Sequence, residues 1–285
     1  MSRSGVGRPI TIGVVDKQEA ALAFAAEEAR LSGCDLQVVH AYVVPPRPPH
    51  AMSTAYGFDI DGSFRESGRD VLESAIAFLT HQAGDLKVQP VLQQGQASTV
   101  LLDASTTSRL LVLGPDDSTP WYARLFQSRV ARRLTHDAPC PVVVVPDTWS
   151  AQVGPRGITL LLDGETLAHG PLRFAFEEAA RHHDVLHIIH LQSGHSPHEE
   201  AVRGQDVRRL IESWRATYPQ VWVRIKNVEG DADLATVTTF ERTGMLVLGR
   251  SHTVHDATAL HRPLARLVIE HADCPVAVVP ADYDV

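Results

Sequence analysis

Two stretches of the chain, LVLG…APCPVVVVP between Leu111 and Pro146 and LVLG…ADCPVAVVP between Leu246 and Pro280, follow one pattern. In each, an apolar run ends in glycine, a loop and a helix-like stretch follow, and Cys-Pro opens a second apolar run. A repeat at this distance predicts two copies of one domain. A ligand site in one copy is therefore expected to have a counterpart in the other.

Size and composition are those of a globular protein with two domains. The 285 residues are 44% hydrophobic and 21% charged, enough for two separate cores. The formal net charge of −8 provides no excess of cations to neutralise phosphates, so a nonspecific nucleic-acid surface is not expected. No apolar run reaches the ~20 residues that span a bilayer, so no membrane association is expected either.

The cysteines and the N-terminus favour a cytoplasmic location. Three cysteines form an odd, sparse set, and Cys140 and Cys274 occupy equivalent positions of the repeat. They are predicted to be buried thiols in a reducing compartment. The opening MSRSGVGRPI lacks the apolar core of a secretion signal.

In the first copy, strand-like and helix-like segments alternate. Apolar runs predict strands, and apolar residues at helical spacing predict helices. Pro45 to Ser63 carries prolines and glycines and is predicted to be a loop. The strands are expected at 9–16, 35–44, 88–95, 110–114 and 141–146, and the helices at 19–33, 67–82, 98–105 and 123–136.

The second copy repeats this order. GITLLLD matches the opening strand of the first copy, including the acid at its end, so Asp163 is matched to Asp16. The copies are expected to be residues 1–147 and 157–285, joined by a linker at 148–156. The other strands are expected at 185–191, 221–228, 245–249 and 275–280, and the helices at 171–183, 199–218 and 233–244.

Strands that are apolar throughout and alternate with helices predict an α/β fold with parallel sheets covered on both faces. The expectation is two tandem Rossmann-like domains, each a doubly wound sheet of about five strands. Ligands bind such sheets beyond the carboxyl ends of the strands, where the strand order reverses. Those positions follow Val15, His40, Leu113, Leu162, His190 and Leu248.

Taken in order and duplicated, these motifs resemble the universal stress protein family in its tandem-domain form. They are a first strand ending in Asp, a second strand with a histidine near its end, LVLG, and a final Cys-Pro-Val strand. The resemblance covers nearly the whole chain and implies the adenine-nucleotide alpha hydrolase-like variant of the Rossmann-like fold. Nucleotide-binding members carry a glycine after the fourth strand, a second glycine three residues later, and a Gly-Ser pair at the start of the last helix. These groups let the backbone and a helix N-terminus approach phosphates.

In the second copy the resemblance places part of this site. Asp163 and the second-strand residue Leu191 are implied to face ribose and base, and Gly249 fits the first glycine. His252 stands where the second glycine belongs, and Arg262-Pro263 replace Gly-Ser, followed by Leu264. Nearby cations could still attract an anion; they are Arg250, His252, His255, His261 and Arg262.

In the first copy the same site is altered differently. Asp16, Ala41 and Gly114 fit, but Pro115 and two aspartates follow the glycine, and carboxylates repel a polyphosphate. Counting back from the final Cys-Pro puts Ser128-Arg129 at the Gly-Ser positions, followed by Val130; an alignment shifted by one residue puts Gln127-Ser128 there. The aromatic residues of this loop are expected to fill the nucleotide pocket, with packing on a partner as the alternative; they are Trp121, Tyr122 and Phe126.

The sequence therefore predicts a stress-response regulatory or interaction module with nucleotide binding weakened or lost. The alternative is an ATP- or adenylate-binding protein that acts mainly through the second copy, with slow hydrolysis. No spacing of nucleophile and base indicates an enzyme, so at most a weak ATPase is expected. ATP is the only cofactor that the resemblance suggests.

Fifteen histidines raise the question of a metal site. His187 and His190 are three residues apart on one predicted strand, so their side chains point to opposite faces. The remaining histidines of this region are interpreted as residues of loops and helix ends, and no metal site is predicted. They are His182, His183, His195 and His198.

The final apolar strands, VVVV and VAVV, would be an aggregation risk if exposed at a sheet edge. The resemblance implies that the last strand pairs with that of another domain. The two copies are thus expected to pair with each other, with further homo-oligomers and an unidentified protein partner left open.

Overall fold

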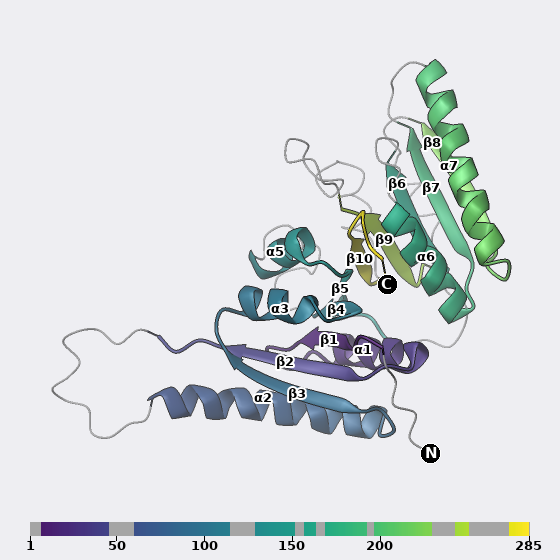
Figure 1. The fold of residues 1–285 in the computed structure, drawn as a ribbon. Coiled ribbons are helices and arrows are strands. Elements are labelled where there is room, and N and C mark those ends of the chain that lie inside the picture. The colour runs from purple at the N-terminus through teal and green to yellow at the C-terminus, as the bar shows by residue number, and fades with distance from the viewer. Residues whose placement is uncertain are drawn as a thin grey trace.

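A computed structural model gives the fold of the chain (Figure 1). It describes residues 7–45, 60–114, 129–151, 157–163, 169–192, 197–229, 243–250 and 274–284. Strands and helices alternate in both halves of the chain, as the sequence predicts. The fold is therefore α/β, with nearly all strands parallel to their neighbours.

The first half begins with a strand and an alanine-rich helix whose end has a clear local cause. Gly33 lies at φ 64°, and the amides of Gly33 and Cys34 donate to the carbonyls of Arg30 and Ala29. Such a left-handed residue ends a helix by satisfying its last carbonyls. The elements of this half are β1 (Ile10–Gly13), α1 (Glu19–Ser32), β2 (Leu36–Tyr42), α2 (Ile60–Gln82), β3 (Val88–Gln94), α3 (Ala97–Ser105), β4 (Leu110–Leu113), α5 (Arg129–Asp137) and β5 (Val142–Val144).

The second half repeats this order with a less usual helix end. His183 follows the first helix at φ 57°, the place that Gly33 takes in the first half. The elements are β6 (Ile158–Asp163), α6 (His169–His182), β7 (Leu186–Gln192), α7 (Pro197–Thr217), β8 (Val223–Glu229), β9 (Met245–Gly249) and β10 (Val276–Val279). The helix predicted at 233–244 lies almost entirely outside the described residues.

The ten strands of the described residues form one sheet in the order β3-β2-β1-β4-β5-β10-β9-β6-β7-β8. Each half contributes five parallel strands, and the halves meet where β5 and β10 pair antiparallel. Val144 lies opposite Val276 and Val142 opposite Val278 in this pair. The two apolar final strands therefore lie in the middle of the sheet, and β3 and β8 form its edges.

Each face of the sheet carries a core that runs through both halves. Ile12, Val143 and Leu160 belong to the core on one face, which α1, α2, α6 and α7 cover. Leu113, Val144 and Val276 belong to the core on the other face, together with residues of α3 and α5. The three cysteines are buried as free thiols, which confirms the prediction for Cys140 and Cys274.

One sequence prediction about the boundaries is wrong. The loop predicted to run from Pro45 to Ser63 ends earlier, because α2 begins at Ile60 rather than near Ser67. Gly62 and Ser63 lie inside its first turn, and the Ser67 hydroxyl donates to the Ser63 carbonyl. In the part of the chain described here, no helix is both long and apolar enough to cross a membrane.

Candidate functional site

The strand order reverses beside β1 in the first half and beside β6 in the second. β1 lies between β2 and β4, and β6 lies between β7 and β9. In an open parallel sheet, the carboxyl ends on either side of such a reversal form the usual ligand crevice. The candidate clefts therefore lie at the segment after β1 with Gly114, and at the end of β6 with Gly249.

In the first half, the segment after β1 is held by polar side chains. The Val14 amide donates to the Val39 carbonyl at 2.9 Å, and the His40 Nδ1 atom lies 2.8 Å from the Val14 carbonyl oxygen. The Val15 amide donates to the Gln18 Oε1 atom at 3.2 Å. The Gln18 side chain therefore braces the loop that in a nucleotide site would face the ligand.

Asp16 and Gln18 are buried to opposite degrees. Asp16, predicted to face the ribose, is exposed, whereas Gln18 is only 5% exposed and precedes the first residue of α1. Ala41, the predicted base-facing position, is half-buried and pairs with Gln93 of β3. The structure thus places the predicted acid on the surface, whereas Gln18, which the sequence did not single out, is buried against Gly114.

Gly114, predicted to admit a phosphate, has a packing role. A Cβ atom on Gly114 would lie 2.9 Å from the Ala21 Cβ and 3.1 Å from the Gln18 Cβ. Cβ contacts below 3 Å are essentially never tolerated, so a side chain here would push α1 away from β4. The close approach of helix to strand is sufficient reason for this glycine.

Gly249 makes a similar approach in the second half. A Cβ there would lie 3.1 Å from the Pro171 Cγ in the first turn of α6. Ala21 and Pro171 are equivalent, because each lies two residues after the first residue of its helix (21 − 19 and 171 − 169). Both retained glycines thus face the first helix of their own half.

The two opening acids are not equivalent, which corrects the sequence match. Asp163 is still within β6, where it pairs with Leu191 of β7. In the first half the register pairs Gly13 with Val39, and continuing it sets Val15, not Asp16, opposite Ala41. Asp16 therefore lies one residue further along than Asp163, because the first strand segment has one residue more before its acid.

Arg250, predicted to attract an anion to the second site, is engaged elsewhere. Its Nη1 atom donates to the Ala138 carbonyl at 2.7 Å, just beyond the C-terminal end of α5 in the other half. Its amide donates to the Val279 carbonyl. Burial lowers the pKa of Arg250, and the nearby acids Asp282 and Asp137 partly offset this effect. The guanidinium thus joins the two halves.

Most of the remaining predicted site residues lie outside the described residues. Arg129 and Val130 begin α5 as the structure gives it, and Val130 packs against the core on that face of the sheet. The others are Gln127, Ser128, His252, His255, His261, Arg262, Pro263 and Leu264, together with Trp121, Tyr122 and Phe126 of the first loop.

The sequence analysis missed an aromatic contact that is repeated in the two halves. Trp149 meets Phe24 edge-on at 5.4 Å between ring centroids, and Tyr283 meets Phe174 in the same way at 5.8 Å. Trp149 and Tyr283 each lie three residues after the proline that follows the final strand, which was the available signal. Each contact anchors the segment after the last strand to the first helix of the same half.

The sequence model of the universal stress protein family matches residues 8–146. No curated protein sequence matches the chain.

Two solved structures share the fold over nearly their whole length. One is a universal stress protein from Archaeoglobus fulgidus DSM 4304, with a TM-score of 0.66, 14% identity and 95% of each chain covered. The other, from Pseudomonas aeruginosa UCBPP-PA14, is named as a candidate universal stress protein; its TM-score is 0.59 at 17% identity, with 96% of this chain and 94% of that chain covered. Residues 8–146 thus match the sequence model of the universal stress protein family, and the likeness to these solved structures shows the same fold over both halves of the chain.

Proposed function

We propose that the chain is a stress-response regulatory or interaction module built from two universal stress protein domains, with nucleotide binding weakened or lost. The domains would comprise residues 1–147 and 157–285, with a linker at 148–156. A cytoplasmic location fits three buried cysteines that are all free thiols.

The packing of Gly114 carries this proposal. A phosphate-binding glycine is useful because its bare backbone lets the ligand come close. A Cβ on Gly114 would meet Ala21 and Gln18 of the chain itself, and one on Gly249 would meet Pro171, so packing alone accounts for both glycines. Retention of the glycines is therefore no sign of a retained phosphate site.

The charges beside the clefts support the same conclusion. A polyphosphate needs cations or free N–H donors close to it. The guanidinium of Arg250 donates a hydrogen bond to the Ala138 carbonyl, and the Gln18 side chain accepts a hydrogen bond from the Val15 amide. These contacts use groups that would otherwise be available to an anion.

A role in protein interaction is supported by the outer strand of the second half. Trp222 is 78% exposed just before β8, and Ile225 within β8 is 43% exposed. β8 is an edge of the described sheet, and both exposed apolar residues belong to this edge segment. Exposed tryptophan is enriched where proteins bind one another.

ATP or adenylate binding through the second domain, with slow hydrolysis, is the second candidate. One observation favours it: Asp163 lies within β6 beside Leu191, the arrangement that the family resemblance implies for ribose and base. The first domain lacks this arrangement, because its acid is one residue out of register.

Isothermal titration of the full-length chain with ATP and magnesium separates the two candidates. The proposal expects a dissociation constant of about 1 mM or weaker, which corresponds to a binding free energy of about −4 kcal/mol. Asp163→Asn and the matched Asp16→Asn should leave that value unchanged. Micromolar binding that Asp163→Asn abolishes and Asp16→Asn preserves would establish the second candidate instead.

A further inference from the structure

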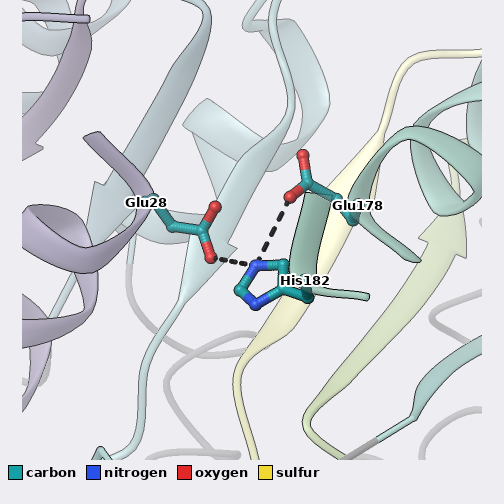
Figure 2. A group of neighbouring side chains, drawn as sticks. All are labelled: Glu28, Glu178 and His182. Carbon is teal, nitrogen blue, oxygen red and sulfur yellow. Dashed lines mark hydrogen bonds and ion pairs between the residues drawn. The ribbon is translucent and has the colours of Figure 1, made fainter. Parts of the chain in front are cut away.

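Glu28, Glu178 and His182 form a buried group where the two halves meet (Figure 2). Glu28 belongs to α1, whereas Glu178 and His182 lie one turn apart in α6. One possible ligand atom from each residue lies within 4.8 Å of the others. The group thus joins residues that are 154 positions apart in the chain.

The carboxylates converge on one imidazole nitrogen. The His182 Nε2 atom lies 2.8 Å from the Glu28 Oε1 atom and 3.7 Å from the Glu178 Oε2 atom. Figure 2 shows both acids directed at this nitrogen from opposite helices. Ligand atoms around a tetrahedral zinc ion are about 3.4 Å apart, so these separations bracket the spacing that zinc requires.

Two oxygens of the group lack a hydrogen-bond donor. Glu28 and Glu178 are 1% and 2% exposed, and among the described residues no group donates a hydrogen bond to the Oε2 atom of either. A buried carboxylate oxygen left in this state is costly unless a cation or donor meets it. The Glu178 Oε2 atom is also the one that faces His182.

The surroundings favour a positive charge at this point. Glu27 also acts on His182, so three carboxylates surround it, and Arg181 is the cation paired with Glu178. These carboxylates outnumber the cation beside them, which favours a further positive charge at this point.

Arg181 and the exposure of His182 complete the arrangement. Arg181 donates to the Glu178 Oε1 atom, which orients that carboxylate and leaves Oε2 directed at His182. Such outer contacts are typical of carboxylates that bind metals. The His182 side chain is 18% exposed, so an ion and a water ligand can reach the group from its side.

We propose that Glu28, Glu178 and His182 bind one divalent transition-metal ion, with zinc as the best match, and thereby join the two halves of the chain. One imidazole nitrogen and two carboxylate oxygens are ligands that zinc accepts, with the fourth position left to water. Binding requires His182 to release its Nε2 proton to solvent.

The test is zinc titration of the full-length chain after it has been stripped with a chelator. One zinc ion per chain should bind with micromolar or tighter affinity. Glu28→Gln and His182→Asn should each weaken it by at least about tenfold. His183→Asn is the matched control, because His183 is the next residue, is exposed, and asparagine tolerates its positive φ.

Two results would overturn the proposal. One is wild-type zinc affinity no tighter than that of the two ligand variants, and the other is an equal loss in His183→Asn. If either ligand variant fails to fold, NMR spectra of the wild-type chain labelled with ¹⁵N-histidine test the site instead. Zinc should then shift the Nε2 resonance of one histidine at a ratio of one ion per chain; no such shift would contradict the site.

Discussion

Glu28 and Glu178 occupy equivalent positions of the two halves, each nine residues after the start of its helix (28 − 19 and 178 − 169), and both carboxylates face His182. The contact thus relates the two copies of the repeat through one side chain of the second copy. Such a buried ionic contact specifies how the halves pack, since removing one partner leaves the others without their counter-charge.

Glu28→Ala should lower the free energy of unfolding of the metal-free chain by about 3 kcal/mol, because it leaves a buried imidazolium without its hydrogen-bond partner. Urea denaturation in the presence of a chelator measures this loss. Glu27→Ala is the control, since Glu27 is only half-buried and acts on His182 through its charge alone. Equal losses in the two variants would show that the contact with His182 does not stabilise the fold.

The metal-free chain should lose stability as the pH rises from about 6.5 to about 9. The folded state holds the His182 proton up to a pKa of about 9, whereas the unfolded state releases it near 6.5. The contribution is therefore complete below pH 6.5 and lost above 9, and amounts to about 3 kcal/mol. Glu27 and Glu28 face this imidazole from α1, and Glu178 and Arg181 from α6.

Urea midpoints across this pH range, with chelator present, check the sign and the size of the change. The pKa of Glu178 is raised by burial and by the charge of Glu28, so its contribution also falls as the pH rises. His182→Asn should flatten most of the slope. A wild-type midpoint that stays constant or rises toward pH 9 would be incompatible with a shared proton at His182.

Gly170→Ala should destabilise the chain by about 3 kcal/mol or more, because the new Cβ would lie 2.2 Å from the Pro280 carbonyl oxygen and 2.8 Å from two other backbone atoms. Backbone cannot move aside as a side chain can. Gly13→Ala is the control: its Cβ would meet only the Leu101 methyl groups, and a loss of about 1 kcal/mol is expected. Thermal unfolding of both variants measures the two losses of stability. Similar losses would mean that the segment after β10 is free to shift.

Arg250→Ala should lower the free energy of unfolding by about 2 kcal/mol, because the Ala138 carbonyl would lose a charged donor at a half-buried position. Arg215→Ala, which removes an exposed pair with Glu212, should change it by less than 0.5 kcal/mol, roughly the value of a surface ion pair. Denaturant midpoints of both variants provide the comparison. A neutral Arg250→Ala would mean that the guanidinium remains available for a ligand.

The fold was predictable because its signal is periodic and duplicated. The runs that became β4, β5, β9 and β10 are apolar throughout, and such runs between helices indicate a parallel sheet. Gly33 likewise marks the end of α1 in the sequence itself. The start of α2 was misplaced because Gly62 is typical of loops, although a helix tolerates it at its first turn.

The candidate site was less predictable, because its contacts join distant segments. Nothing local distinguishes Gln18, which becomes buried against Gly114, from the exposed Asp16 two residues earlier. Arg250 directly follows a strand, at a position where a ligand-binding residue is expected. Its side chain instead donates a hydrogen bond to the carbonyl of Ala138, 112 residues away in the sequence. Glu28 and His182 meet only after the two halves have paired, and histidine spacing along the chain carries no trace of that contact.

On the proposed function, contacts within the chain take the place of nucleotide contacts at the strand ends of both halves. A crystal structure of the full-length chain grown with stoichiometric ATP and magnesium tests it most directly. We expect no nucleotide at the strand ends of either half, with the Gln18 side chain against Gly114 and Arg250 bonded to the Ala138 carbonyl. Adenine and phosphate density beside Gly114 or Gly249, with Gln18 or Arg250 displaced, would contradict it.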